Sequence, residues 1–418
     1  MHITILFCSF KRNYIKISVH STIVIMAEQE GILRKIIDVI AKDQKYLNFN
    51  VTVKPISTDG ANYTSKLFLI TVSEADKENL ELFVKFNTFS EKICSELHYY
   101  GYETERFMYT ELAKTYKAIE EENKIPLENK LFIPQHYNCD LNIARETLVL
   151  ENLQSKGYTT RDRFESIDWE YASKSVETLA KFHALSIPHR GNRSSTFNNL
   201  LNNKGPAFYF ISNIKESYPV IIENAINATN DKNKEKVKNY INNIAIFEKY
   251  QSFYTNHLRR QFIIHGDFRV SNLMHKVNED GSLVVIPVDY QTIHMSSPVL
   301  DLLFFIFTGS DEAFRRQYYD QLIEHYYKEL RRALSQLHVD PDKVYSKKDF
   351  ESDLKEFSTF GLFTSMCVLP LITVEAEDAP EMGEEVSDIH SFVRLNCTPR
   401  YRERWNGIVN DYIRWGIL

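Results

Sequence analysis

The spacing of the apolar residues changes once along this chain, and that change limits the possible folds more than any other feature. Between Val51 and Leu150 the apolar residues form short runs or alternate as in strands, apart from one helical pattern that begins at Tyr102. After a polar stretch that begins at Glu151, they recur mostly at helical spacing. The pattern predicts an α+β chain with a strand-rich first part and a larger, mainly helical second part.

The length of 418 residues also indicates two domains or two lobes, because a single hydrophobic core stops growing at roughly 250–300 residues. We place an N-lobe, an antiparallel sheet plus a helix, at residues 26–153 and a helical C-lobe at residues 154–418. Met26 opens an amphipathic pattern of the kind that often begins a cytosolic protein. We therefore expect residues 1–25 to be a disordered tail or a mis-annotated extension.

Individual elements follow from the same patterns. Two strands are expected between Val51 and Val72 around a turn at Asp59–Gly60, a third in "LELFVKF" at residues 80–86, and a fourth at Thr147–Leu150. A hairpin is expected around Asn278–Gly281, where glycine supplies a positive φ. Helices are expected at Trp169–Leu185, Phe208–Ile226, Asn239–Leu258, Glu312–Leu337 and Phe350–Leu369.

Composition excludes several classes of protein. A net charge of −6 gives no general attraction to nucleic acid or to an anionic membrane. No stretch approaches the roughly 20 apolar residues of a spanning helix. The five cysteines are scattered without metal-ligand spacing, which argues against zinc and favours a reducing compartment. We expect a cytoplasmic protein without a membrane span, a nucleic-acid partner or an obligate protein partner.

Polar side chains gather where apolar segments end. The block "HGDFRVSN", residues 265–272, follows the apolar run Phe262–Ile264, and Asp289 ends the second hairpin strand. Lys85 lies within an apolar strand, either at an exposed edge or pointing into a cleft, and Glu105 lies in the next helix. Phosphoryl transfer uses this set of groups: a lysine for phosphates, a glutamate that holds it, a base, and oxygen ligands for Mg²⁺.

The hairpin predicts that the downstream groups converge. Asp267 and Asn272 lie on one short loop, and the hairpin that follows returns the chain so that Asp289 reaches the same end of the sheet. Asn272 and Asp289 can therefore face one Mg²⁺ ion. We expect His265 to brace the loop through hydrogen bonds and His183 to be a packed structural residue.

These motifs resemble those of a known family. "IIHGDFRVSNLMH", "VIPVDYQ" and "SSPVLDLLFF" are similar to the HGDxxxxN…D pattern of phosphotransferases with the protein-kinase-like fold. Other ordered matches run from "DGANYTS" and "FVKF" through "LVLENLQSKGY" to "YRERWNGIVNDYIRWGIL". The chain most closely resembles the ecdysteroid kinase-like family, which is related to choline and aminoglycoside kinases. The resemblance implies a two-lobed protein-kinase-like fold that uses ATP and Mg²⁺.

The resemblance also implies a role for each matching residue. Asp267 would be the catalytic base, and Asn272 and Asp289 would bind Mg²⁺. Lys85 and Glu105 would form the ion pair that positions the nucleotide.

Other positions would complete the nucleotide site and its support. The loop that contains Gly60 and Asn62 would cover the phosphates, although it has one glycine where protein kinases have several. Glu151 and Leu153 would present backbone groups to the nucleotide base, while a plain inter-lobe linker fits them equally. Asp301 resembles the family's structural aspartate, which supports the catalytic loop.

Two residues of the "HGDFRVSN" block depart from the family pattern. Arg269 and Ser271 stand where the family often has Trp and Asn. Arg269 could meet a phosphate or alter the acceptor pocket, so the departure leaves the identity of the substrate open.

The sequence thus predicts a phosphotransferase that phosphorylates a hydroxyl of a small molecule, either an ecdysteroid or another lipophilic alcohol. Two alternatives remain at this stage. One is a choline- or aminoglycoside-type kinase, whose cationic acceptor the acidic segment at residues 375–388 could attract. The other is a catalytically silent ligand-binding protein that retains the kinase fold.

Overall fold

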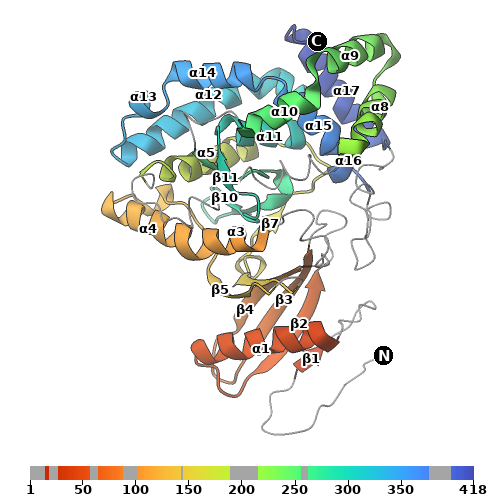
Figure 1. Cartoon of the computed structure of the whole chain (residues 1–418). Coiled ribbons are helices and arrows are strands. Elements are labelled where there is room, and N and C mark those ends of the chain that lie inside the picture. The colour runs from red at the N-terminus through yellow and green to blue at the C-terminus, as the bar shows by residue number, and fades with distance from the viewer. Residues whose placement is uncertain are drawn as a thin grey trace.

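The two predicted parts form two lobes in the computed structural model of the chain (Figure 1). A β-sheet with one helix across it lies at one end, and a group of helices lies at the other. The two-lobed protein-kinase-like fold expected from the sequence is therefore confirmed. The structure describes residues 15–17, 27–56, 65–87, 101–142, 145–188, 215–255, 262–375 and 397–418.

The N-lobe is built on a six-stranded sheet in the order β1-β2-β3-β4-β6-β5. Strand β1 pairs with β2 in parallel, and the other neighbours are antiparallel. Helix α1 (Ala27–Asp43) packs its apolar residues against one face of the sheet. The strands are β1 (Ile15–Ile17), β2 (Asn50–Ile56), β3 (Ser65–Ser73), β4 (Leu80–Asn87), β5 (His136–Asp140) and β6 (Thr147–Glu151).

Four of these strands were expected, and one of them is β6, which matches the strand predicted at Thr147–Leu150. Strands β2 and β3 are the two predicted between Val51 and Val72, while their predicted turn at Asp59–Gly60 lies outside the described residues. Strand β4 is the predicted "LELFVKF" strand. Strand β1 lies within residues 1–25, the segment expected to be a tail or an extension. The nature of that segment and the boundaries of the two lobes stay predictions.

Strand β4 separates two apolar cores. Leu82, Val84 and Phe86 point to the smaller core beneath α1. Phe83, on the opposite face, packs against the larger core, which includes most of the C-lobe helices. Side chains alternate between the faces of a strand, so Lys85 shares the face of Phe83 and points toward the C-lobe.

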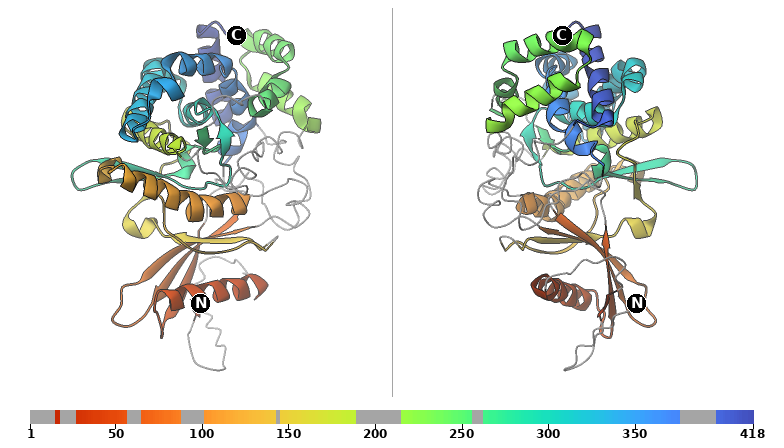
Figure 2. Two further views of the ribbon diagram at one scale, coloured as in Figure 1. Left: turned by 60° about the vertical axis from the view of Figure 1, so that its left-hand side comes forward. Right: turned by 90° about the vertical axis from the view of Figure 1, so that its right-hand side faces the viewer.

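The helix predicted from Tyr102 onward lies between the sheet and the C-lobe (Figures 1 and 2). It consists of α3 (Gly101–Phe107), a π-helical turn η1 (Met108–Leu112) and α4 (Ala113–Glu122). Its buried face belongs to the larger core, together with C-lobe residues. The helix therefore joins the N-lobe sheet to the C-lobe by apolar packing.

The C-lobe is mainly helical. Helix α5 has the bounds that the sequence predicted, and the Asp168 carboxylate caps it by accepting from the backbone N–H of Tyr171 at 2.8 Å. The helices are α5 (Trp169–Leu185), α8 (Tyr218–Ala228), α9 (Asp231–Ile244), α10 (Ile246–Thr255), α11 (Val299–Gly309), α12 (Glu312–Gln336), α13 (Pro341–Val344), α14 (Lys347–Glu356), α15 (Phe360–Cys367), α16 (Leu369–Ile372) and α17 (Pro399–Arg414).

Two predicted helices are interrupted. The segment expected at Asn239–Leu258 breaks between α9 and α10, where Ala245 adopts a left-handed φ of 45°. The segment expected at Phe350–Leu369 breaks between α14 and α15, and again between α15 and α16. Apolar spacing continues through these breaks, so periodicity alone does not reveal them.

Short strands flank the block at residues 265–272, which lies between the lobes (Figure 1). The predicted hairpin is β9 (Leu273–Val277) and β10 (Leu283–Pro287), with β7 (Thr159–Thr160) on the other edge of β9. Strand β8 (Phe262–Ile264) pairs with β11 (His294–Ser296). Within the described parts of the chain, no helix is both long enough and apolar enough to cross a membrane.

Helix α17 is tied to α12 by a fully buried ion pair. Nε of Arg315 donates to Oδ2 of Asp411 at 2.5 Å, and both side chains are 0% exposed. Nη1 of Arg315 also donates to the carbonyl of Ser310 at 2.6 Å.

We expect Arg315→Met to lower the free energy of unfolding by about 3–5 kcal/mol, because it leaves the Asp411 carboxylate buried without its main partner. Urea unfolding of the full chain measures the change. Arg331→Met is the matched control, because Arg331 pairs with Asp342 at an exposed site and its loss should cost less than about 1 kcal/mol. Equal losses for the two variants would contradict the assignment.

Candidate active site

Lys85 lies at the centre of the site. Its strand, β4, is flanked on both sides, with Leu67 of β3 and Leu148 of β6 as register partners. The residue is only 4% exposed. The sequence allowed Lys85 to lie either at an exposed edge or in a cleft. The exposed edge is wrong, because the lysine is buried and points between the lobes.

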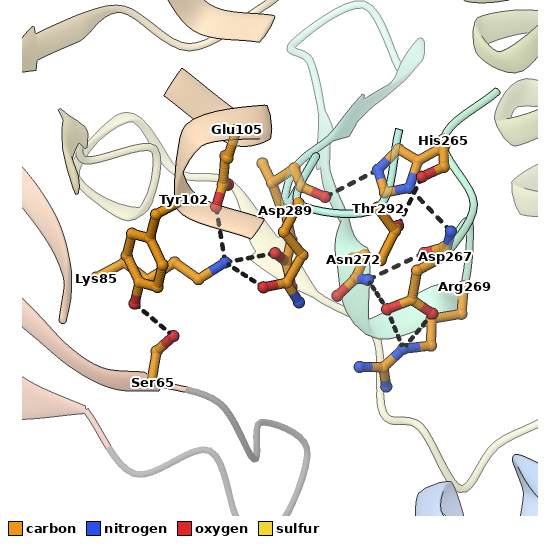
Figure 3. Close-up of polar contacts among 12 residues, drawn as sticks. Ser65, Lys85, Tyr102, Glu105, His265, Asp267, Arg269, Asn272, Asp289 and Thr292 are labelled. Atoms are coloured by element: carbon orange, nitrogen blue, oxygen red, sulfur yellow. Dashed lines mark hydrogen bonds and ion pairs between the residues drawn. The ribbon is translucent and has the colours of Figure 1, made fainter. Parts of the chain in front are cut away.

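The Lys85 ammonium joins residues from three parts of the chain (Figure 3). Its Nζ donates to Oε2 of Glu105 on α3 at 2.8 Å and to Oδ1 of Asp289 at 2.5 Å. It also lies 3.4 Å from Oε1 of Gln291. The structure thus brings the predicted Lys85–Glu105 pair together and adds Asp289, which is 204 residues away along the chain.

Two carboxyl groups share this one ammonium, and their surroundings push their pKa values apart. Burial raises the pKa of Glu105 to about 7, although Lys85 opposes the rise. Burial also raises the pKa of Asp289, but the charge and hydrogen bond of Lys85 outweigh it and hold that pKa below its ordinary value. The charge of Arg269 lowers the pKa of Asp289 further, so Asp289 carries its charge more readily than Glu105 does.

The hairpin places Asn272 and Asp289 at one end of the small sheet. Leu273 of β9 pairs with Pro287 of β10, and the backbone N–H of Val288 donates to the carbonyl of Asn272 at 2.9 Å. Asp289 follows at once, with a φ of 67° that is uncommon for a residue other than glycine. Such conformations persist where surrounding contacts hold them, often at functional sites.

Asp267 lies against Asn272 on the same loop (Figure 3). Nδ2 of Asn272 donates to Oδ2 of Asp267 at 2.9 Å and to its backbone carbonyl at 3.0 Å. Nε of Arg269 donates to Oδ1 of Asp267 at 3.0 Å and to Oδ2 at 3.2 Å. Both oxygens of the candidate base are thus held by hydrogen bonds from its own loop.

Asp301 on α11 holds the start of this loop, as the resemblance implied. Its carboxylate accepts from the backbone N–H of His265 at 2.6 Å and from that of Gly266 at 2.8 Å. His183 of α5 lies 3.1 Å away through Nε2. Burial raises the pKa of Asp301, but His183 and the other donors outweigh it and lower the pKa below its ordinary value. A buried carboxylate therefore fixes the loop to the helical core.

The hydrogen-bond partners of His265 define its protonation. Its Nε2 lies 3.1 Å from the carbonyl of Val288, which can only accept, so Nε2 carries the proton. Its Nδ1 accepts from the backbone N–H of Asp267 at 3.3 Å. Both ring nitrogens are engaged within the loop, and His265 braces it in the way expected from the sequence.

Gly266 is needed for the shape of the loop. Its φ is +79°, and a Cβ at this position would lie 2.5 Å from the backbone carbonyl oxygen of Thr292. That carbonyl belongs to the segment that ties back to the loop, because Oγ1 of Thr292 donates to the carbonyl of His265 at 2.7 Å. The glycine of the HGD motif therefore permits a close approach of two backbones.

The candidate Mg²⁺ ligands fit the preferences of that ion. They comprise the carboxylate of Asp289 and the amide oxygen of Asn272, whose Nδ2 end is turned to Asp267. One or two carboxylates with substrate phosphates and water are usual for Mg²⁺. Within the described residues, no group of three or more His, Cys, Asp or Glu side chains is arranged to hold a metal ion.

The remaining predicted positions are less informative. Gly60 and Asn62 lie outside the described residues. The Glu151 carboxylate pairs with Lys156 and accepts from the backbone N–H of Gln135 at 3.3 Å. The Leu153 carbonyl accepts from the backbone of the following turn. A role of residues 151–153 at the nucleotide base stays a prediction.

The structure adds residues that the sequence did not indicate. Gln291 contacts both Lys85 and Asp289, and its only signal was its position two residues after Asp289 in "VDYQ". The Lys85 Nζ lies 5.7 Å from the centroid of the Tyr102 ring. The Tyr102 hydroxyl forms a hydrogen bond of 2.8 Å with the hydroxyl of Ser65. These contacts depend on packing between elements and have no local pattern.

The lobes and this arrangement define a kinase-like fold with a candidate phosphotransfer site. The family model of the ecdysteroid kinase-like family matches residues 59–339, which is more than half of the 418 residues. The chain belongs to the ecdysteroid kinase-like family, as the sequence motifs predicted. Among proteins with curated descriptions, none matches this chain.

Several solved structures are similar to the chain at low sequence identity. An ethanolamine kinase from Plasmodium vivax is 11% identical, with a TM-score of 0.41, over 84% of this chain and 83% of that one. An aminoglycoside phosphotransferase from Streptomyces rimosus, in complex with ADP and streptomycin, is 13% identical, with a TM-score of 0.39, over 73% of this chain and 97% of that one.

We expect Asp301→Asn to destabilise the protein by about 3 kcal/mol at pH 7, because an amide cannot accept from two backbone N–H groups and His183 as the carboxylate does. Urea unfolding as a function of pH measures the difference.

The difference should also depend on pH. The pKa of Asp301 is lower in the folded protein, so its contribution is fully present above the unfolded pKa of about 4 and is lost as pH falls below that value. The difference in stability between the wild type and Asp301→Asn should therefore narrow as the pH falls below about 4. A difference that stays constant as the pH falls would contradict the role of the carboxylate.

Proposed function

We propose that this protein is an ATP- and Mg²⁺-dependent kinase that phosphorylates a hydroxyl of a small molecule. One observation carries the proposal: Lys85, Glu105 and Asp289 share one buried ion-pair network, and Asn272, which the hairpin brings to the same end as Asp289, donates to Asp267. Phosphoryl transfer needs these groups at one place, in these roles. A cytoplasmic location is part of the proposal. It is supported by Cys139, Cys367 and Cys397, which are free thiols, as is usual in a reducing compartment.

In this proposal the chain's own residues orient the two substrates. Lys85 binds the phosphates of ATP, and Glu105 keeps the ammonium in place. Asn272 and Asp289 hold Mg²⁺, which when bound neutralises charge on the phosphates. Lys85 also contacts Asp289, so its ammonium would lie beside both the phosphates and a proposed metal ligand.

Asp267 orients the acceptor and takes its proton. The acceptor oxygen forms a bond to the γ-phosphorus, the bond from that phosphorus to the bridging oxygen of ADP breaks, and the hydroxyl proton passes to the Asp267 carboxylate. Asn272 and Arg269 fix the carboxylate for this task. ADP leaves with the bridging oxygen.

We propose an ecdysteroid or another lipophilic alcohol as the acceptor. Membership of the ecdysteroid kinase-like family supports this class.

Replacement of Asp267 by Asn should lower the turnover number for phosphoryl transfer at least about 100-fold, because the amide cannot accept the proton. Affinity for MgATP should change less than about threefold, because Asp267 is not among the proposed metal or phosphate ligands. Steady-state kinetics and calorimetry measure the two quantities. Undiminished turnover would remove Asp267 from the role of base.

A panel of acceptors with labelled ATP tests the substrate class. We expect label to appear on an ecdysteroid or a related hydroxylated lipophile, and not on choline or an aminoglycoside. Transfer to choline or an aminoglycoside alone would favour the second type of kinase. Mg²⁺-dependent binding of ATP without transfer to any acceptor would argue for a silent ligand-binding protein.

A further inference from the structure

Three arginines surround Phe164, which lies in the segment between β7 and α5. The guanidinium carbons of Arg163 and Arg400 each lie 4.1 Å from the centroid of the Phe164 ring. Nη2 of Arg404 donates to the backbone carbonyl of Phe164 at 3.0 Å. Arg400 and Arg404 belong to α17, whereas Arg163 comes from the segment of Phe164 itself. We call Arg163, Arg400 and Arg404 the arginine cluster.

Part of the cluster has a structural role. Arg163 follows the end of α16, where its Nη1 donates to the carbonyl of Ile372 at 2.5 Å and its Nη2 to that of Val374 at 2.7 Å. The bond from Arg404 to Phe164 ties the same segment to α17. Packing between these segments therefore explains the donors of Arg163 and one donor of Arg404.

Two further donors of the cluster are not explained in this way. Nε of Arg400 and Nη1 of Arg404 are buried, and no acceptor among the described residues lies within hydrogen-bond distance of either. Arg404 is only 8% exposed, whereas the Arg400 side chain is 37% exposed and opens the cluster to solvent. A buried charged donor without a partner is costly, so native proteins usually provide an acceptor, a water or an ion.

Electrostatics favours an ion over a water. Arg400 and Arg404 are four residues apart on one helix, where like charges repel, and Arg400 lies in the first turn, where the helix dipole disfavours a cation. Burial lowers the pKa of Arg404, and the charges of Arg315 and Arg400 lower it further, although Asp311 opposes the fall. A water molecule can accept hydrogen bonds, but it cannot offset this positive charge.

The acidic groups nearby offset only part of the charge. Nη2 of Arg400 donates to Oε1 of Glu375 at 3.1 Å, and that carboxylate is 46% exposed. Asp311 uses one oxygen to cap α12 at the backbone N–H of Phe314, at 2.7 Å, and it acts on Arg404 only through space, as Glu403 does. Within these contacts, three guanidinium groups face one carboxylate.

The excess of positive charge indicates the class of anion. A phosphate group carries about −1.5 to −2 at pH 7, which matches the charge that remains after Glu375 has paired. Its oxygens also suit the planar fork of donors in arginine. A single further carboxylate would offset less of the charge.

The segment of Phe164 lies beside the block at residues 265–272. The backbone N–H of Ile167 donates to the carbonyl of Gly309 at 3.0 Å. A Cβ at Gly309 would lie 3.4 Å from a methyl carbon of Ile167 and 3.0 Å from one of Val270, which belongs to that block. The cluster is therefore on the side of the C-lobe that carries the candidate base, although it shares no residue with the proposed nucleotide site.

We propose that the arginine cluster is a phosphate-binding site, in which Arg400 and Arg404 donate to the phosphate oxygens and Arg163 contributes its charge. The site goes beyond the proposed kinase function, because none of the residues assigned to that function belongs to it. Its ligand is either inorganic phosphate or the phosphate group of a small molecule.

Equilibrium dialysis of the full chain against labelled inorganic phosphate tests the site, with chloride keeping the ionic strength constant. The variants are Arg400→Gln and Arg404→Gln. Arg331→Gln is the matched control, because Arg331 forms an arginine–aspartate pair at an exposed position of the C-lobe. Lys85→Gln reports any phosphate held at the proposed nucleotide site. Thermal unfolding in chloride alone shows whether each variant folds.

The wild type should bind phosphate, and each cluster variant should bind it at least about tenfold more weakly, because each loses a charge-assisted hydrogen bond. Arg331→Gln and Lys85→Gln should retain the binding that the cluster variants lose. Arg400→Gln keeps the test decisive if Arg404→Gln does not fold, because Arg400 is the more exposed of the two.

Competition with phenyl phosphate distinguishes the two sources of the phosphate group. Displacement of the label at a lower concentration than inorganic phosphate requires would identify the phosphate of a small molecule as the ligand. Displacement only at an equal or higher concentration would identify inorganic phosphate.

Four outcomes would overturn the proposal. They are a wild type that binds no phosphate, full binding in both cluster variants, an equal loss in Arg331→Gln, and a loss confined to Lys85→Gln. Failure of the kinase function has a different signature, since a protein that binds no MgATP can still bind phosphate at the arginine cluster.

Discussion

The ammonium of Lys85 holds the candidate site together. It is 4% exposed, and its partners come from the sheet's neighbouring helix and from the end of a hairpin in the other part of the chain. A buried charge is costly unless it is paired, so the lobes must be positioned to bring Glu105 and Asp289 to it. The electrostatic requirement and the apolar packing of α3 therefore fix the same arrangement of the two lobes.

A second network fixes the loop that would act on the acceptor. Asp301 of α11 binds the loop backbone, His183 of α5 binds Asp301, and the hydroxyl of Tyr326 on α12 lies 2.7 Å from Nδ1 of His183. The chain of contacts runs from the loop into the helical core. Burial lowers the pKa of His183, although Asp301 opposes the fall, which favours the neutral ring. The loop thus rests on a rigid support, as precise positioning of a base requires.

Much of the site could be predicted because it is local. The approach of Asn272 to Asp289 follows from hairpin pairing. The requirement for Gly266 was not predicted, because it depends on the Thr292 backbone, which only the fold brings close. The partners of Lys85 were only partly predicted: the resemblance indicated Glu105, but not the sharing of the ammonium with Asp289. The contact of Arg269 with Asp267 depends on a side-chain rotamer, so the two-residue spacing did not reveal it.

The sequence by itself determined the change from strands to helices and the position of the β9–β10 hairpin, and it placed Lys85 within a strand. These features depend on side-chain periodicity and turn chemistry, which act over a few residues. Only the tertiary structure decided that Glu105 and Asp289 compete for one ammonium, that Asp301 is held by His183, and that α9 and α10 are separate helices. Such contacts arise when elements pack and exclude water, because charges then interact with whatever the packing places beside them, regardless of distance along the chain.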